Sequence, residues 1–177
     1  VYSSVDKSFV HASTFSENSL AMRAALATLD VVENEDLESQ SLKKGEYLRA
    51  KLRDRLLKYE IVQEVRGLGL MNGIVFQPPK SLALKMLYGS FRKAHPGLFG
   101  QMVVRTLFNE HHVLCQMAGN EYSVIKSMPP LIISEAQLDR YVDAFESVVK
   151  TIINEKTKFW PQGLDIAAKA FAAKVGG

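Results

Sequence analysis

The feature that most constrains this chain is an amphipathic segment between residues 134 and 155. Its apolar residues recur at steps of four and three: Leu138, Val142, Phe145, Val149 and Ile152. This spacing places them on one side of an α-helix. Ser134 and Gln137 precede the run with the S-x-x-Q spacing of a capping box, which predicts where the helix begins. The chain must therefore bury one side of a long helix against other elements.

Two other stretches predict pairs of strands. Residues 61–76, "IVQEVRGLGLMNGIVF", are rich in β-branched residues, and their glycines indicate a bend between two strands. "VLCQMA" and "YSVIKS" are separated by Gly119 and Asn120, a pair typical of a tight hairpin turn.

Helices are predicted on both sides of these strands. Residues 17–33 are apolar around most of a helical circumference, so we expect that helix to be buried. A second helix over 36–59 has a narrower apolar stripe. Its cations between Lys43 and Lys58 are expected to form a solvated face rather than a binding patch.

The remaining helices are shorter or less distinct. Residues 80–97 suggest a short helix near 82–87 and then a loop around "HPG" at 95–97, and 98–110 suggests another helix. "FWPQG" is expected to break the chain before a last helix from Leu164. The element order indicates an α+β fold, with a small, mostly antiparallel sheet and helices on one face.

Composition excludes some classes of protein. The 177 residues carry a net charge of +3, which is too mild to indicate nucleic-acid binding. Apolar runs are far shorter than the roughly 18 residues of a membrane span. The single cysteine, Cys115, cannot form an internal disulfide, which favours a cytoplasmic protein with a buried thiol. The histidines lack metal-ligand spacing, so no metal site is expected.

Two hydroxyl residues stand out in "HASTFSENSLAM". Ser13 and Thr14 come just before a helix expected to begin near Glu17, and Ser16 is better placed to cap it. The extra hydroxyls either take part in capping or hold a phosphate, because a helix start offers free N–H groups and a favourable dipole. Spacing alone leaves both alternatives open.

Three phrases of the chain resemble one family. "HASTFSENSLA" resembles the H-x-S-T-F-G-G-N-P-L-A segment of class III (subgroup II) PLP-dependent aminotransferases. "VRGLGLMNGIVF" resembles their V-R-G-x-G-L strand pair, and "MPPLIISEAQ" their P-P-L entry to the last helix. The phrases occur in the family's order and cover most of the chain. "FSENSLAM" and "LFGQMVV" also resemble a branch linked to hopanoid-lipid and other secondary metabolism.

The resemblance implies the C-terminal portion of a fold-type I enzyme. Its parts would be the tail of the large PLP-binding domain, linking helices, the small α+β domain and a C-terminal helical extension, at 1–16, 17–60, 61–158 and 159–177. In this family the lysine that holds PLP as an imine lies upstream of the S-T-F phrase. Lys7 has the wrong context for that role. No catalytic residue is therefore expected in this chain, which alone should be inactive.

The resemblance also implies a cofactor and an oligomer. The family's S-T-F threonine binds the PLP phosphate of the neighbouring subunit, a role that falls to Thr14 with Ser13 beside it. The partner would then be a second subunit, in a homodimer or a larger symmetric oligomer. The family's G-G-N-P turn is changed here to S-E-N-S, which alters the backbone next to this site.

Lys126 is the candidate substrate-binding residue. Family members that act on amino acids often carry arginine three residues before the P-P pair, where it binds a carboxylate bidentately. Lys126 keeps the charge without the two-point geometry. We therefore expect one substrate to carry its amine or aldehyde on a larger molecule, the other being an ordinary amino acid. The alternative is that Lys126 only reaches solvent. Arg66 is expected to have a structural role, binding backbone carbonyls near the domain joint.

The resemblance implies transfer of an amino group between an amino acid and an aldehyde or keto substrate. Relatives of the same fold carry out mutase, racemase or decarboxylase chemistry, so that reaction class stays open. A non-enzymatic α+β interaction module is a third alternative.

Overall fold

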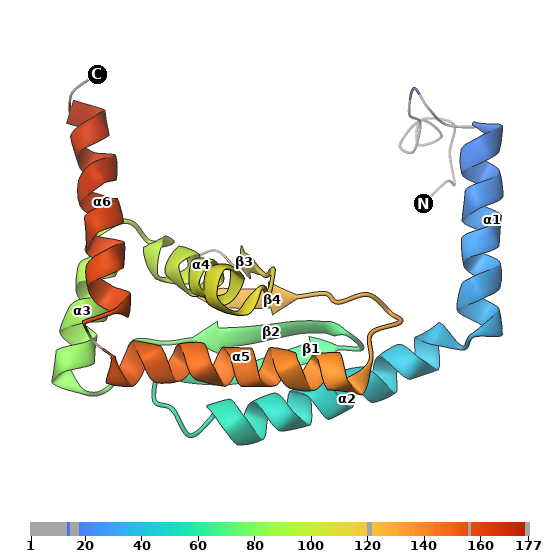
Figure 1. Cartoon of the computed structure of the whole chain (residues 1–177), viewed down its shortest axis with the longest axis horizontal. Coiled ribbons are helices and arrows are strands. Elements are labelled where there is room, and N and C mark those ends of the chain that lie inside the picture. The colour runs from blue at the N-terminus through green and yellow to red at the C-terminus, as the bar shows by residue number, and fades with distance from the viewer. Residues whose placement is uncertain (1–13, 15–17, 120–121, 156, 176–177) are drawn as a thin grey trace, which may run out of the picture. The chain divides into compact units, whose positions relative to one another are not determined.

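The computed structural model describes residues 14, 18–119, 122–155 and 157–175 (Figure 1). The elements follow the order α1 (Ser19–Asn34), α2 (Leu37–Leu56), β1 (Val62–Leu68), β2 (Met71–Phe76), α3 (Leu82–Ala94), α4 (Leu98–His111), β3 (Gln116–Ala118), β4 (Val124–Ser127), α5 (Glu135–Asn154) and α6 (Phe159–Val175). Contacts divide the chain into two compact units, Val1–Glu38 and Ser39–Gly177.

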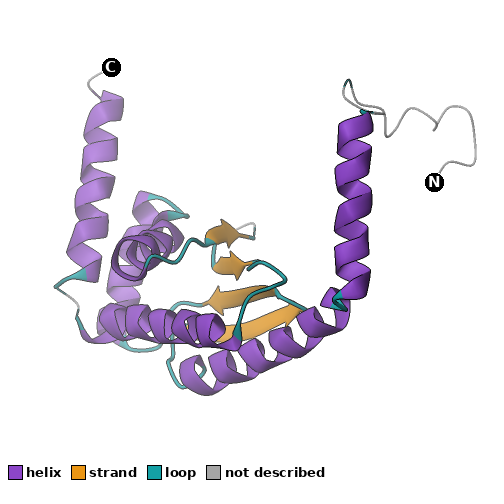
Figure 2. Ribbon diagram, turned by 45° about the vertical axis from the view of Figure 1, so that its right-hand side comes forward, coloured by secondary structure: helices purple, strands orange, loops and turns teal. Residues whose placement is uncertain are grey.

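The second unit is built on one small sheet. Its four strands lie in the order β1-β2-β4-β3, and every neighbouring pair is antiparallel (Figure 2). Gly69 turns the chain between β1 and β2 with a φ of 52°, a left-handed conformation that favours glycine. The predicted α+β fold and both strand pairs are confirmed. The second hairpin is shorter than predicted, with only Gln116–Ala118 and Val124–Ser127 in strands.

Helices α2, α4 and α5 bury one face of this sheet. The residues of that face include Val65, Ile74 and Ile125, which share one cross-strand row. They belong to the same hydrophobic core as apolar side chains of the three helices: Leu48, Leu52, Leu56, Val103, Leu107, Leu138, Val142, Phe145 and Val149. The predicted stripe of α5 is therefore the side that faces the core. Its predicted capping box is also present, with Ser134 and Gln137 bonded reciprocally.

The basic side of α2 differs from its prediction. Lys51 lies 2.6 Å from Asp139 of α5, and Arg55 contacts both Asp143 and Glu146. These residues lie almost ninety positions apart in sequence, so the pattern of α2 alone could not reveal the pairing. Much of the expected solvated face is instead an ion-paired seam between α2 and α5.

Two other predictions about helices are wrong. Helix α3 runs from Leu82 to Ala94 and is longer than the short helix expected near 82–87, because Leu84, Tyr88 and Phe91 form a buried stripe, whereas the loop expected at 95–97 is present. "FWPQG" does not break the chain but starts α6 at Phe159. Pro161 is tolerated there because first-turn N–H groups have no acceptor within the helix.

Helix α1 belongs to the first unit and buries none of its residues. The prediction that this helix is buried is wrong for the chain as it stands. Met22, Leu26 and Leu29 are each more than half exposed and lie on one side at steps of four and three. A helix this apolar is typical of the interior of a larger protein.

Candidate functional site

The start of α1 is capped by Asn18. The Asn18 side chain accepts hydrogen bonds from the backbone N–H groups of Leu20 (3.0 Å) and Ala21 (3.1 Å). The helix thus begins at Ser19, two residues after the expected Glu17, and the expectation that Ser16 caps it is wrong. Asparagine caps as well as serine does, so the sequence did not distinguish the two positions.

This cap bears on the predicted phosphate site. Two first-turn amides are occupied by Asn18, so they are not available to an anion at this helix start. Thr14 lies further upstream, exposed in a turn. Its hydroxyl is not needed to cap α1. Ser13 lies outside the described residues.

Lys126 lies in β4 on the sheet face that the helices leave uncovered. It pairs with Gly73 of β2 and Gln116 of β3, and Gly73 pairs in turn with Arg66 of β1. Residues directly opposite one another in antiparallel strands project from the same face. Lys126 and Arg66 therefore flank a glycine, about 10 Å apart across two strand spacings. We call this face, with Arg66, Gly73, Gln116 and Lys126, the open face.

The charge on the open face is only partly neutralised. Arg66 has a long contact of 3.6 Å to Glu64, and both side chains are about half exposed or more. Within the described part of the chain, the Lys126 ammonium group makes no hydrogen bond or ion pair. The row thus presents two cations, one of them unpaired, to whatever faces the sheet.

Arg49, not Arg66, binds backbone at the β1–β2 turn. The Arg49 guanidinium donates to the Gly69 carbonyl (2.6 Å) and to the Asn72 side chain (3.1 Å), and is almost fully buried. Among the described residues no hydrogen bond joins the Arg66 side chain to a backbone carbonyl, so its expected role near the domain joint stays a prediction. Gly45 could have indicated from the sequence that α2 packs closely against this turn. A Cβ at Gly45 would collide with the Gly69 carbonyl.

Cys115 and Tyr141 lie together on the core side of the sheet. The Cys115 thiol is buried, which confirms that prediction, and burial raises its pKa to about 11. Burial, with a smaller contribution from Cys115, raises the pKa of Tyr141 well above its ordinary value. Both side chains therefore remain neutral at physiological pH.

The described residues contain no group of three or more His, Cys, Asp or Glu side chains that could hold a metal ion. None of the helices in the described ranges is both long and apolar enough to cross a membrane.

The comparisons with known proteins decide the family. A family model described as Aminotransferase class-III matches residues 1–149. The chain belongs to this family. A Schizosaccharomyces pombe protein named as an uncharacterized aminotransferase is 33% identical over 150 residues, which are 84% of this chain and 29% of that protein. A diaminobutyrate–2-oxoglutarate aminotransferase of Rhizobium meliloti is 32% identical over 80% of this chain and 29% of its own length.

Solved structures of class-III aminotransferases agree with the fold. Acetylornithine aminotransferase from Elizabethkingia anophelis aligns with a TM-score of 0.55 at 29% identity, covering 78% of this chain and 32% of that one. This chain therefore spans about 30% of the length of the relatives that it matches. The predicted resemblance to class III is confirmed.

Proposed function

We propose that this chain is the C-terminal part of a PLP-dependent aminotransferase that moves an amino group between an amino acid and an aldehyde or keto substrate. The observation that carries the proposal is the class-III match across residues 1–149. The domain scheme predicted from the sequence is part of the proposal. Residues 1–16 end the large domain, 17–60 link the domains, 61–158 form the small domain and 159–177 extend it.

The open face is the part of this chain proposed to meet a substrate. Lys126 is half-buried in β4 and unpaired among the described residues, and Arg66 adds a second cation in the same row. An unpaired ammonium group on a sheet face suits an anionic substrate group. A lysine presents a point charge rather than a planar fork, so it tolerates several orientations of that group.

Thr14 and Ser13 are proposed to hold the PLP phosphate of a neighbouring subunit. An exposed threonine in a turn, not required for capping α1, has a hydroxyl that can donate to a phosphate oxygen. PLP, when bound, supplies the electron sink that amino-group transfer needs. The role of this chain is to bind the phosphate and to orient the substrate. In this scheme the lysine that accepts and returns the proton lies outside residues 1–177.

The cofactor role is tested on a protein that includes the large domain. Thr14→Ala should weaken PLP affinity by about tenfold, the effect of losing one charge-assisted hydrogen bond. Thr28→Ala is the control, because Thr28 lies on α1 and bonds only the Ala24 carbonyl within the described chain. Equal PLP affinity of the two variants would contradict the role of Thr14.

The substrate role is tested on the same protein by steady-state kinetics. Lys126→Met should raise KM about tenfold for one substrate, the one whose anionic group Lys126 binds, and leave KM for the other unchanged. Lys44→Met serves as the control, since that lysine binds only the Leu131 carbonyl among described residues. If Lys126→Met left both KM values unchanged, Lys126 would be a solvent-facing strand residue.

A further inference from the structure

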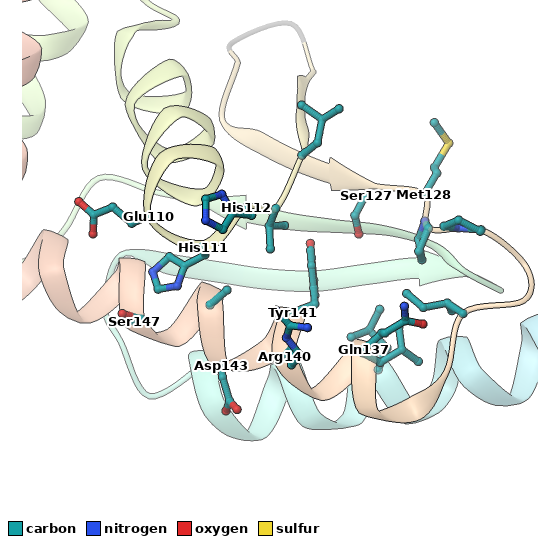
Figure 3. A pocket seen from close by; sticks show the side chains of 18 residues that line it. Glu110, His111, His112, Ser127, Met128, Gln137, Arg140, Tyr141, Asp143 and Ser147 are labelled. Atoms are coloured by element: carbon teal, nitrogen blue, oxygen red, sulfur yellow. The ribbon is translucent and has the colours of Figure 1, made fainter.

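A groove opens on the core side of β4, behind the open face. It lies between the C-terminal end of α4, the segment that follows β4 and one side of α5 (Figure 3). Its volume of about 870 Å³ falls within the roughly 300–1,000 Å³ typical of pockets for small organic molecules. All of its lining residues belong to the second unit.

The floor of the groove is apolar. Leu48 of α2 and both Leu138 and Ala144 of α5 line it, and all three are almost fully buried. Met128 and Pro129 form a wall that continues from β4. Such a floor favours the apolar body of a ligand over water.

The charge at the groove favours an anion. Two acidic residues line it, but Glu110 lies 3.2 Å from Lys158 and Asp143 lies 2.8 Å from Arg55. Arg140 also lines the groove and has no ion pair in the part of the chain that the structure describes. Its guanidinium is the positive charge that remains uncompensated.

Polar donors surround the middle of the groove. Figure 3 shows Tyr141 rising from α5 toward the sheet, with His111 and His112 on one side and Ser127 on the other. The Ser127 hydroxyl is buried beside the Tyr141 hydroxyl, where it lowers the pKa of Tyr141 slightly against the larger effect of burial, and it makes no hydrogen bond of ordinary geometry among the described residues. A buried hydroxyl of this kind is normally paired. A ligand oxygen in the groove would supply its partner.

We propose that this groove binds a small organic acid with an apolar body and one carboxylate. The body packs on Leu138 and Ala144, and the carboxylate is held by Arg140 with donors from the surrounding polar side chains. This site does not depend on the proposed aminotransferase activity. Ser127 of the groove and Lys126 of the open face are consecutive in β4 and project to opposite faces of the sheet, so the two sites are separate.

The probe for the test is phenylpropionate, with the uncharged phenylpropanol as its matched comparison. Titration of the isotope-labelled chain, followed by amide NMR, should give saturable shifts at residues that line the groove. We expect a dissociation constant of roughly 1 mM or lower, and at least about tenfold weaker binding of phenylpropanol.

Two variants then test whether Arg140 binds the carboxylate of phenylpropionate. Arg140→Gln should weaken phenylpropionate binding about tenfold, and Arg105→Gln, an exposed arginine of α4 outside the groove, should leave it unchanged. Both changes are on the surface, and the NMR spectra report whether each variant stays folded. Absence of saturable shifts in the groove, shifts confined to α1, or equal effects of the two variants would overturn the proposal.

Discussion

The Arg55 guanidinium of α2 lies 2.6 Å from the Glu146 carboxylate of α5, and the Glu146 side chain is only 5% exposed. Lys58 and Lys150 also contact that carboxylate, at 3.0 and 3.3 Å, and the Tyr59 hydroxyl donates to it. One buried acid thus contacts three cations, from α2, from the turn that follows α2 and from α5 itself. Glu146 is the centre of the seam that joins α2 to α5.

Removing this charge should destabilise the fold. Glu146→Gln keeps the size of the side chain but leaves the three cations facing one another, at a cost of about 2 kcal/mol in the free energy of unfolding. Asp54→Asn, an exposed acid of α2, should cost less than about 0.5 kcal/mol. Urea denaturation of the two variants measures the difference. Similar midpoints would mean that the seam contributes little.

The same carboxylate should make stability depend on pH. Its hydrogen bonds to Lys58, Arg55 and Lys150 outweigh the effect of burial and lower the pKa of Glu146 to about 2. The folded state therefore holds this proton more weakly than the unfolded chain does. Its contribution to stability is fully present above the ordinary glutamate pKa of 4.5 and is lost as the pH falls toward 2. In urea titrations at pH 6 and pH 3, Glu146→Gln should lose less stability than the parent chain, whereas parallel losses would refute the assignment.

Arg49 should contribute to the stability of the fold, whereas Arg66 should contribute little. Arg49→Met removes the donors to the Gly69 carbonyl and Asn72 inside the protein, which should cost about 3 kcal/mol. Arg66 is 61% exposed, so Arg66→Met should change stability by less than about 0.5 kcal/mol. Thermal denaturation of both variants tests this. A larger effect at Arg66 would favour the role first expected from the sequence.

The exposed apolar side of α1 should drive self-association of the chain. Met22, Leu26 and Leu29 form a stripe on this helix that water contacts. Leu26→Glu should weaken concentration-dependent association in sedimentation velocity, whereas Thr28→Glu adds the same charge away from the stripe and should not. A chain that stays monomeric at all concentrations would show that the apolar stripe of α1 does not drive self-association.

Trp160 offers a direct probe of how α6 begins. It is the single tryptophan, is completely buried, and its indole N–H donates to the Ile152 carbonyl at 2.9 Å. We expect blue-shifted fluorescence that resists quenching by acrylamide and moves to the red on unfolding. Ready quenching in the folded chain would favour the chain break first expected at "FWPQG".

Local patterns predicted the elements of the fold well. Three predicted features depend only on residues that are close in sequence, and each is confirmed. They are the capping box of Ser134 and Gln137, the stripe of α5 and the glycine bend near Gly69. Pro161 misled the prediction because a proline ends a helix in most positions and is tolerated only in the first turn. The cap at Asn18 was missed because serine and asparagine are about equally suitable.

The candidate sites were harder to predict from the sequence than the elements of the fold. Lys126 was found through a family phrase, but its neighbour Arg66 on the open face follows only from strand register. The groove combines side chains from α2, α4, β4 and α5, which no single periodic pattern connects. The roles of Thr14, Ser13 and Lys126, the branch of the family and the domain boundaries remain predictions.

Strand β4 is hydrogen-bonded on both sides, to β2 and to β3. Sliding it by one residue would break two ladders at once and would exchange the faces of Lys126 and Ser127. Insertions between Ala118 and Val124 should therefore lengthen the connection without displacing either side chain. The cation on one side of β4 and the hydroxyl on the other are thus fixed by the same two ladders.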